Sequence, residues 1–195
     1  MSIEFKTEEL KRYILERQKT GTRTLIAIDG RCGSGKTTLA AELMEAAGCT
    51  VIHMDYFYLR AEQRTPERLD EPGGNVDRER FLEEVLGPLK DGAEIISYHV
   101  FDHTIMDLRE QVTVVPDTVV VIEGSYSMHP DLTEYYDLRV FLTIPEDVQR
   151  ARIIAREGEE KAEMFFSRWI PMEEKYFSHF KIEEKADVVI TGFEV

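Results

Sequence analysis

The stretch that decides the fold is Gly30-Arg31-Cys32-Gly33-Ser34-Gly35-Lys36-Thr37, which fits the pattern G-x-x-x-x-G-K-[ST] of a phosphate-binding loop. It follows a short apolar run, residues 24–29, and precedes a segment with Leu39 and Leu43 at helical spacing. A strand before the loop and a helix after it are the context in which this pattern binds phosphate, and they argue against a glycine-rich turn that binds nothing. The sequence therefore predicts an α/β P-loop NTPase fold.

The residues of the loop suit a nucleotide and its metal. The glycines allow successive backbone N–H groups to converge on phosphate oxygens, and the following helix adds a favourable dipole. Lys36 can reach the β- and γ-phosphates, and Thr37 can place its hydroxyl on Mg²⁺. The expected cofactors are ATP and Mg²⁺. The residues expected to contact the nucleotide are Gly30, Arg31, Cys32, Gly33, Ser34, Gly35, Lys36, Thr37 and Thr38.

Composition limits the partners of the chain. Its 195 residues suffice for one buried core, so residues 1–195 are expected to form a single domain. A formal net charge of −14 argues against binding along a nucleic-acid backbone, which requires clustered Lys and Arg. Because the sequence has neither an apolar run of about 18 residues nor a signal-peptide core, we expect no membrane partner and a cytoplasmic location. Cys32 and Cys49 give no disulfide framework, and Cys32 is either an inert small side chain or a redox group inside the loop.

Strand and helix signals alternate along the chain, which predicts a mainly parallel sheet flanked by helices. Besides the helix after the phosphate loop, we expect helices over about 7–19 and 77–89. Strands are expected over 24–29, 50–54, 94–101, 118–122, 138–142 and 187–190. Residues 62–76 mix proline, glycine and charged residues and predict a loop, which belongs to a flap over about residues 56–93.

Two carboxylates follow predicted strands. Glu123 ends an apolar run, and parallel sheets bind ligands at that end, so Glu123 either helps to hold Mg²⁺ or is an acid at a surface junction. Asp55 follows the strand after the phosphate-loop helix, where it can take the proton of an attacking alcohol, approach the metal or merely cap a turn. The expected metal ligands are Thr37, Asp55 and Glu123. The aromatic residues after Asp55, Tyr58 among them, can wall an acceptor pocket.

Asp55-Tyr56-Phe57-Tyr58, after this loop, resembles the uridine kinase family of P-loop nucleoside kinases. Further similar segments are Asn75-Val76-Asp77, Tyr98 to His103, Val119 to Gly124, Tyr136 to Leu142 and the helix Val148 to Arg156. The similarity covers about residues 22–156. It implies ATP-dependent phosphorylation of a nucleoside 5′-hydroxyl, most commonly of uridine or cytidine, with Asp55 as the base. It also implies that Tyr98 and His103 face the nucleobase and that Asp77 binds the ribose hydroxyls.

The chain departs from this family at the lid, about residues 150–165. Arg150, Arg152 and Arg156 lead into Glu157-Gly158-Glu159-Glu160-Lys161, so the lid is acidic and reduced. Arg152 and Arg156 lie on one helical face, where they can stabilise the transferring phosphoryl group. The other interpretation is a solvated salt-bridge face, since Arg150 follows Glu146 by four residues.

The phosphoryl acceptor has the weakest basis in the sequence. In a strictly regular strand Tyr98 and His103 face opposite sides, so both reach one ligand only if the chain bends near Asp102. Alternative acceptors are the other small alcohols of the related pantothenate, phosphoribulose and nicotinamide riboside kinases. A nucleotide-hydrolysing regulatory protein is a further alternative, although the guanine signature Asn-Lys-x-Asp is absent. The sequence leaves open ATP against GTP and whether the chain forms a homo-oligomer.

Overall fold

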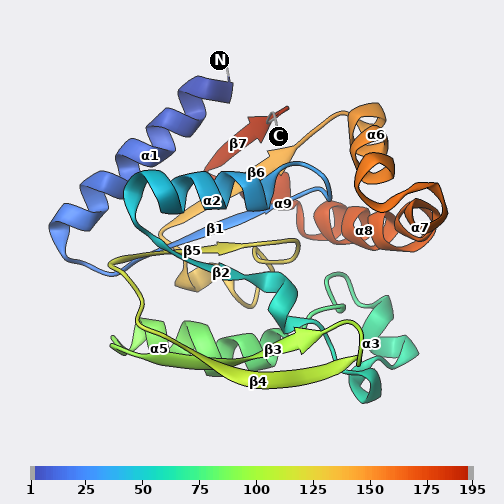
Figure 1. The fold of residues 1–195 in the computed structure, drawn as a ribbon, viewed down its shortest axis with the longest axis horizontal. Coiled ribbons are helices and arrows are strands. Elements are labelled where there is room, and N and C mark those ends of the chain that lie inside the picture. The colour runs from blue at the N-terminus through green and yellow to red at the C-terminus, as the bar shows by residue number, and fades with distance from the viewer. Residues whose placement is uncertain (1–2, 193–195) are drawn as a thin grey trace.

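The computed structural model describes residues 3–192, with side chains from residue 7 onward, and confirms the expected fold. Five strands form one sheet in the order β2-β5-β1-β6-β7, and every neighbouring pair is parallel (Figure 1). The strands are β1 (Thr24–Gly30), β2 (Thr50–His53), β5 (Val119–Glu123), β6 (Leu138–Thr143) and β7 (Val188–Thr191).

Both faces of the central strands are covered, which explains their apolar composition. Successive side chains of a strand point to opposite faces, so Ile26 and Ile28 join one core cluster while Leu25 and Ala27 join the other. Helices α1 (Ile3–Thr20) and α2 (Lys36–Ala47) cover the first face. The second face packs on the chain that follows β2 (Figure 1). Phe57 and Phe81 of this segment are fully buried.

The chain between β2 and β5 forms a separate layer. It contains the short helices α3 (Pro66–Asp70), α4 (Arg78–Phe81) and α5 (Gly87–Lys90), and a π-helical turn at Leu82–Leu86 joins the last two. The helix expected over 77–89 is thus present as one helical run from 78 to 90. The expected loop over 62–76 contains α3.

The strand expected over 94–101 is β3 (Ile96–Asp102), but it lies outside the parallel sheet. It pairs antiparallel with β4 (Asp107–Val114), a strand that the sequence analysis did not predict. Most residues of β4 are exposed, so its sequence has no clear apolar alternation. Tertiary pairing with β3, rather than a buried face, keeps this segment extended.

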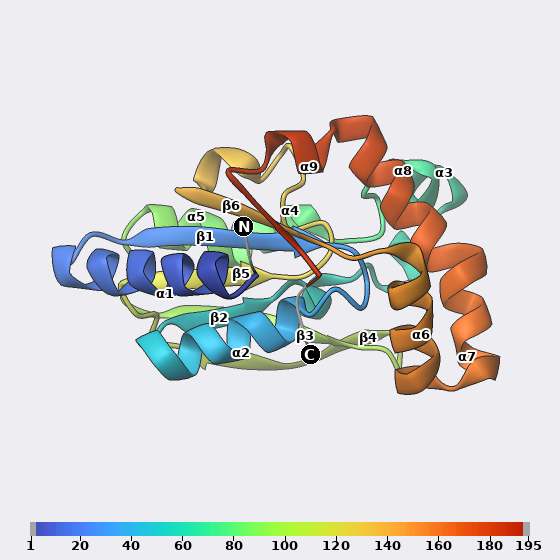
Figure 2. The ribbon, with the colours of Figure 1, turned by 90° about the horizontal axis from the view of Figure 1, so that it is seen from above.

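Four further helices follow β6. They are α6 (Glu146–Glu157), α7 (Glu159–Met164), α8 (Ile170–Phe180) and α9 (Ile182–Lys185), with a π-helical turn Phe165–Trp169 between α7 and α8. Figure 2 shows α6, α7 and α8 together at the end of the molecule where β1 leads into α2. Within the described part of the chain, none of the helices combines the length and hydropathy needed to cross a bilayer.

Gly30 gives a test of the packing between β1 and β6. A Cβ at this position would lie 2.0 Å from the backbone oxygen of Leu142, and the φ of Gly30 is +142°. We expect Gly30→Ala to lower the free energy of unfolding by about 3 kcal/mol, measured by denaturant titration, because backbone must move. Gly21→Ala is the control: Gly21 also has a positive φ but nothing within 4 Å of its Cβ, so its cost is about 1 kcal/mol. Equal losses of unfolding free energy in the two variants would contradict the close approach of β1 and β6.

Candidate active site

A cavity of about 1100 Å³ opens where the chain leaves β1, β2 and β5. The phosphate loop, the segment after β2, the tip of the β3–β4 hairpin and the helices α6 to α8 all contribute to its walls. Its lining includes Lys36, Thr37, Asp55, Tyr58, Arg64, Asn75, His103, Glu123, Arg152, Arg156, Trp169 and Glu173. The carboxyl ends of parallel strands therefore meet at one cavity, as this architecture requires.

The phosphate loop has the backbone expected of its glycines. Gly33 and Gly35 have φ values of +74° and +95°, which other residues rarely adopt. The Lys36 Nζ donates to the backbone oxygens of Gly30 at 2.7 Å and Arg31 at 3.1 Å, so its ammonium lies over the start of the loop. Of the nine residues expected to contact the nucleotide, Cys32, Gly33, Gly35, Lys36, Thr37 and Thr38 line the cavity.

Arg31, Gly30 and Ser34 are placed differently from the rest of the loop. The Arg31 side chain turns outward, donating to Thr143 Oγ1 at 2.7 Å and pairing with Glu174 at 2.9 Å. Gly30 contributes the oxygen that Lys36 contacts, and Ser34 is fully buried. Arg31 thus ties the loop to β6 and α8.

Helix α6 braces the phosphate loop from the other side. Gln149, which is buried, donates to the Cys32 backbone oxygen at 3.0 Å, and Arg152 donates to the Gly33 oxygen at 3.1 Å. Arg156 contacts Cys32 Sγ at 3.6 Å and pairs with Glu157 at 2.7 Å. Both arginines proposed for catalysis therefore already lie at the loop and line the cavity.

The structure adds observations on two questions that the sequence leaves open, the partner of Arg150 and the role of Cys32. Arg150 does not pair with Glu146 as the helical spacing suggested; it lies 3.9 Å from the centre of the Phe166 ring and 4.0 Å from the Glu163 carboxylate. Burial raises the pKa of the Cys32 thiol, which lowers its thiolate fraction and favours the inert interpretation.

Thr37 and Glu123 form a pair suited to a hard cation. The Thr37 hydroxyl lies 3.3 Å from both carboxylate oxygens of Glu123, which is buried at the end of β5. Mg²⁺ in such sites takes one or two protein oxygens and completes its shell with water and substrate phosphates. The residues present therefore fit Mg²⁺, with Thr37 and Glu123 as its holders, and Asp55 lines the same cavity.

His53 is a neighbour that the motif analysis did not identify. Its Nδ1 lies 2.5 Å from Glu123 Oε1, and the hydrogen bond to Glu123 raises the pKa of His53. His53 thus fixes the direction of the Glu123 carboxylate.

The acceptor side of the cavity brings some of the expected residues together. Asp55, Tyr58 and His103 all line it, and the Tyr58 and His103 rings lie 5.3 Å apart. Burial raises the pKa of Tyr58 well above its usual value, and the nearby Asp55 carboxylate raises it further. β3 contains a register shift between His99 and Phe101 and ends at Asp102. His103 follows in the hairpin turn and lines the cavity.

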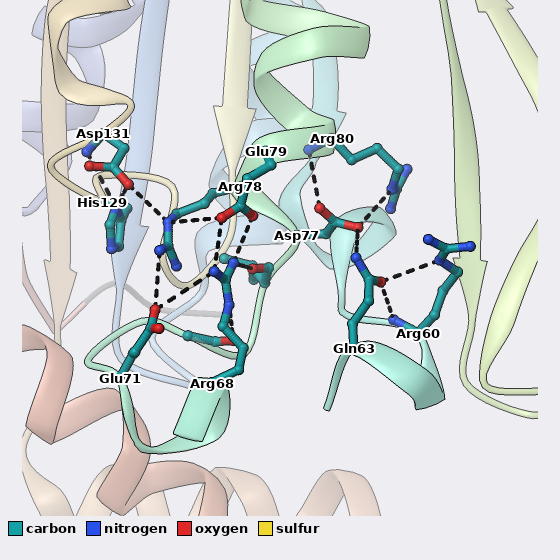
Figure 3. A network of polar contacts seen from close by, with 12 residues as sticks. Arg60, Gln63, Arg68, Glu71, Asp77, Arg78, Glu79, Arg80, His129 and Asp131 are labelled. Atoms are coloured by element: carbon teal, nitrogen blue, oxygen red, sulfur yellow. Dashed lines mark hydrogen bonds and ion pairs between the residues drawn. The ribbon is translucent and has the colours of Figure 1, made fainter. Parts of the chain in front are cut away.

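Tyr98 and Asp77 are placed away from the cavity lining. Tyr98 is buried, 5.5 Å from the Phe57 ring and 6.4 Å from Tyr56. Asp77 caps α4 by accepting from the Arg80 backbone N–H at 3.1 Å, and it also accepts from Gln63 Nε2 at 2.8 Å (Figure 3). The structure therefore holds Asp77 inside the polar network of the flap, with Arg60 and Arg80 beside it.

Several cavity residues were not among the expected site residues. Asn75 is buried, and its Oδ1 has no hydrogen-bond partner among the described residues. Arg64 lies 5.9 Å over the Trp169 ring, and both residues line the cavity. Glu173, from α8, is the least expected because it contacts the phosphate loop directly. Only the tertiary fold brings these side chains to the cavity.

Comparison with known proteins agrees with the fold and the loop. A curated uridine kinase of Staphylococcus aureus (strain JH9) is 26% identical over 185 residues, covering 86% of each chain. A structure described as a possible uridine kinase from Bacillus stearothermophilus has a TM-score of 0.65 at 24% identity, over 93% of this chain and 99% of that one, and supports the fold alone. A proposed fructose transport system kinase from Silicibacter sp. TM1040 has a TM-score of 0.73 at 25% identity, over 94% and 98%.

The family model described as phosphoribulokinase / uridine kinase family matches residues 25–165, which is most of the chain. This range contains the phosphate loop, Asp55, Glu123 and the arginines of α6. The chain therefore belongs to the phosphoribulokinase / uridine kinase family and is a phosphotransferase with an alcohol acceptor.

Proposed function

We propose that this protein transfers the γ-phosphate of ATP to the 5′-hydroxyl of a nucleoside, with uridine or cytidine as the first candidates. The observation that carries the proposal is that Asp55, Lys36 and Thr37 line the same cavity as Tyr58 and His103. A proton acceptor, a phosphate-binding cation and aromatic rings for a base therefore face one cavity. The similarity to the uridine kinase of Staphylococcus aureus supports this acceptor.

In the proposed reaction the protein mainly positions groups and stabilises charge. Asp55 accepts the proton of the attacking hydroxyl, and Lys36 neutralises phosphate charge at the loop. Arg152 and Arg156 of α6 approach the transferring group from the lid side. When bound at Thr37 and Glu123, Mg²⁺ supplies further neutralisation of the phosphate oxygens.

A second acceptor class has support from the flap. Because Asp77 is held by Gln63 and Arg80 and Tyr98 is packed against Phe57, two groups expected to bind the nucleoside are engaged elsewhere. Another small alcohol, as in the pantothenate, phosphoribulose or nicotinamide riboside kinases, would use the same Asp55 and phosphate loop. The likeness to a proposed fructose transport system kinase points in this direction too.

Lys36 tests the phosphate loop. We expect Lys36→Ala to lower kcat by about 10²-fold or more, since it removes a preorganised charge directed at the phosphates. The measurement is ADP release with a saturating acceptor, and Lys11→Ala on α1 is the control with the same change outside the cavity. A folded Lys36→Ala enzyme with the turnover of the wild type would refute the assignment of the loop.

Substitution of Asp55 distinguishes a role as catalytic base from a structural role. We expect Asp55→Asn to lower kcat by about 10²- to 10⁴-fold while the Kd for ATP stays within a few-fold, because the amide keeps the shape but cannot take the proton. Single-turnover phosphate transfer and ATP titration measure the two quantities separately. A variant whose only defect was weak ATP binding would show instead that Asp55 serves the metal or the turn.

The acceptor is tested by a panel of nucleosides and small alcohols assayed for ADP release. We expect pyrimidine nucleosides to be accepted, and His103→Ala to weaken their binding by about 1 to 3 kcal/mol without changing the KM for ATP. Asp77→Asn, which retains an oxygen for the α4 cap, is expected to act in the same direction. Turnover with another alcohol and none with any nucleoside would favour the second acceptor class.

A further inference from the structure

Glu173 is a buried acid that touches the phosphate loop. It lies in the first turn of α8, only 7% exposed, and lines the cavity. Its Oε2 accepts from the Cys32 backbone N–H at 3.0 Å, and its Oε1 accepts from the Ser125 hydroxyl at 2.7 Å. A carboxylate is therefore hydrogen-bonded to a backbone N–H of the phosphate loop, whose N–H groups are the donors that bind phosphate in this motif.

The position of this carboxylate corresponds to the outer end of a bound nucleotide. Cys32 stands in the first half of the loop, under the Lys36 ammonium, which contacts the neighbouring oxygens of Gly30 and Arg31. Lysine in this motif reaches the β- and γ-phosphates, so the Glu173 carboxylate shares their end of the loop. Burial raises the pKa of Glu173, while the Lys36 charge and the Ser125 hydrogen bond oppose that shift. Because Glu173 is only 7% exposed, solvent screens a second negative charge beside it less than it would at the surface.

We propose that Glu173 is a positioning residue that senses the γ-phosphate: it holds the Cys32 amide in the nucleotide-free loop and must leave it when ATP binds. The inference rests on the proposed function, because it requires a nucleoside triphosphate in this loop. Carboxylate and phosphate oxygens compete for the same N–H, and their charges repel in a buried site. ADP lacks the outer phosphate and does not impose this displacement.

Helix α8 can transmit the release of Glu173 from the Cys32 amide to the lid. Tyr176, three residues after Glu173 and on the same helical face, donates to Asp29 Oδ2 at 2.8 Å and is fully buried. Toward its N-terminus α8 continues through the turn Phe165–Trp169 into α7. Tyr176 therefore fixes one point of α8 to the sheet, and Glu173 fixes a second point to the loop that nucleotide binding releases.

The test compares ATP with ADP, because a purely structural Glu173 would alter both affinities alike. Calorimetric titrations with Mg²⁺·ATP and Mg²⁺·ADP, without acceptor, give the two Kd values for the wild type and for Glu173→Gln. Glutamine has the same shape and retains an oxygen for the Cys32 N–H, so the fold is expected to survive. We expect the Kd for ATP to fall by about tenfold or more, while the Kd for ADP changes by less than about threefold.

Glu174→Gln is the matched control. Glu174 is the next residue of the same helix, pairs with the Arg31 side chain at 2.9 Å and is 43% exposed. The same chemical change there is expected to leave the ratio of the two Kd values within about twofold, since solvent screens an exposed pair. If Glu173→Gln failed to fold, Glu173→Asp would replace it: the shorter carboxylate cannot reach both partners, and the ratio should move in the same direction.

Each other outcome overturns the inference in a distinguishable way. Equal changes in both affinities, or weaker ATP binding, would show that Glu173 supports the loop or the nucleotide rather than competing with it. Such a result, with normal ATP binding by the wild type, would leave the proposed function intact. A wild type that bound neither nucleotide would remove the proposed function and the inference together.

Discussion

The carboxylate of Asp29 is the contact on which the site depends. It is fully buried at the end of β1 and accepts from the backbone N–H groups of Gly30 at 2.7 Å, Tyr126 at 3.2 Å and Met128 at 2.9 Å. The Tyr176 hydroxyl supplies a fourth hydrogen bond. Burial raises the pKa of Asp29, and these donors oppose that rise. One side chain thus joins the start of the phosphate loop, the loop after β5 and α8.

This junction sets how the cavity can change shape. Around it the phosphate loop is contacted from α6 by Gln149 and Arg152 and from α8 by Glu173, while Arg31 reaches β6. The contacts through Asp29 lie behind the loop and are buried, whereas those through Arg152 and Glu173 line the cavity. Ligands can therefore compete with the second set and not with the first. The loop keeps its place on the sheet while α6 and α8 remain able to respond to what is bound.

The sequence predicted those features that local chemistry decides. The spacing of Gly30 to Thr37, with a short apolar run before it and helical spacing after it, predicts the loop and the start of the central sheet, because the motif and its flanking patterns agree. The strand β4 could not be predicted in this way, since its exposed, polar residues are extended only by pairing with β3. Tyr98 shows the same limit: its motif suggested a binding role, and the structure places its ring in the core on the same strand face as Ile96, a position that the motif alone does not indicate. Glu173 reaches the phosphate loop through the packing of α8, which is distant from the loop in sequence, and no residue spacing indicates that contact.

The charge of the molecule fits this arrangement. A chain of net charge −14 is expected to bind polyphosphate through groups that act over a few ångströms, namely the loop amides, Lys36 and the α6 arginines. Asp29, Glu123 and Glu173 are all buried around the same loop, so the local field is a balance of closely spaced opposite charges. Asp29 is held by four hydrogen bonds, and Glu123 faces the hydroxyl with which it can share a cation. Glu173 has two donors of its own, and one of them is the Cys32 N–H of the phosphate loop, so the proposed displacement of Glu173 from this amide would be part of nucleotide binding.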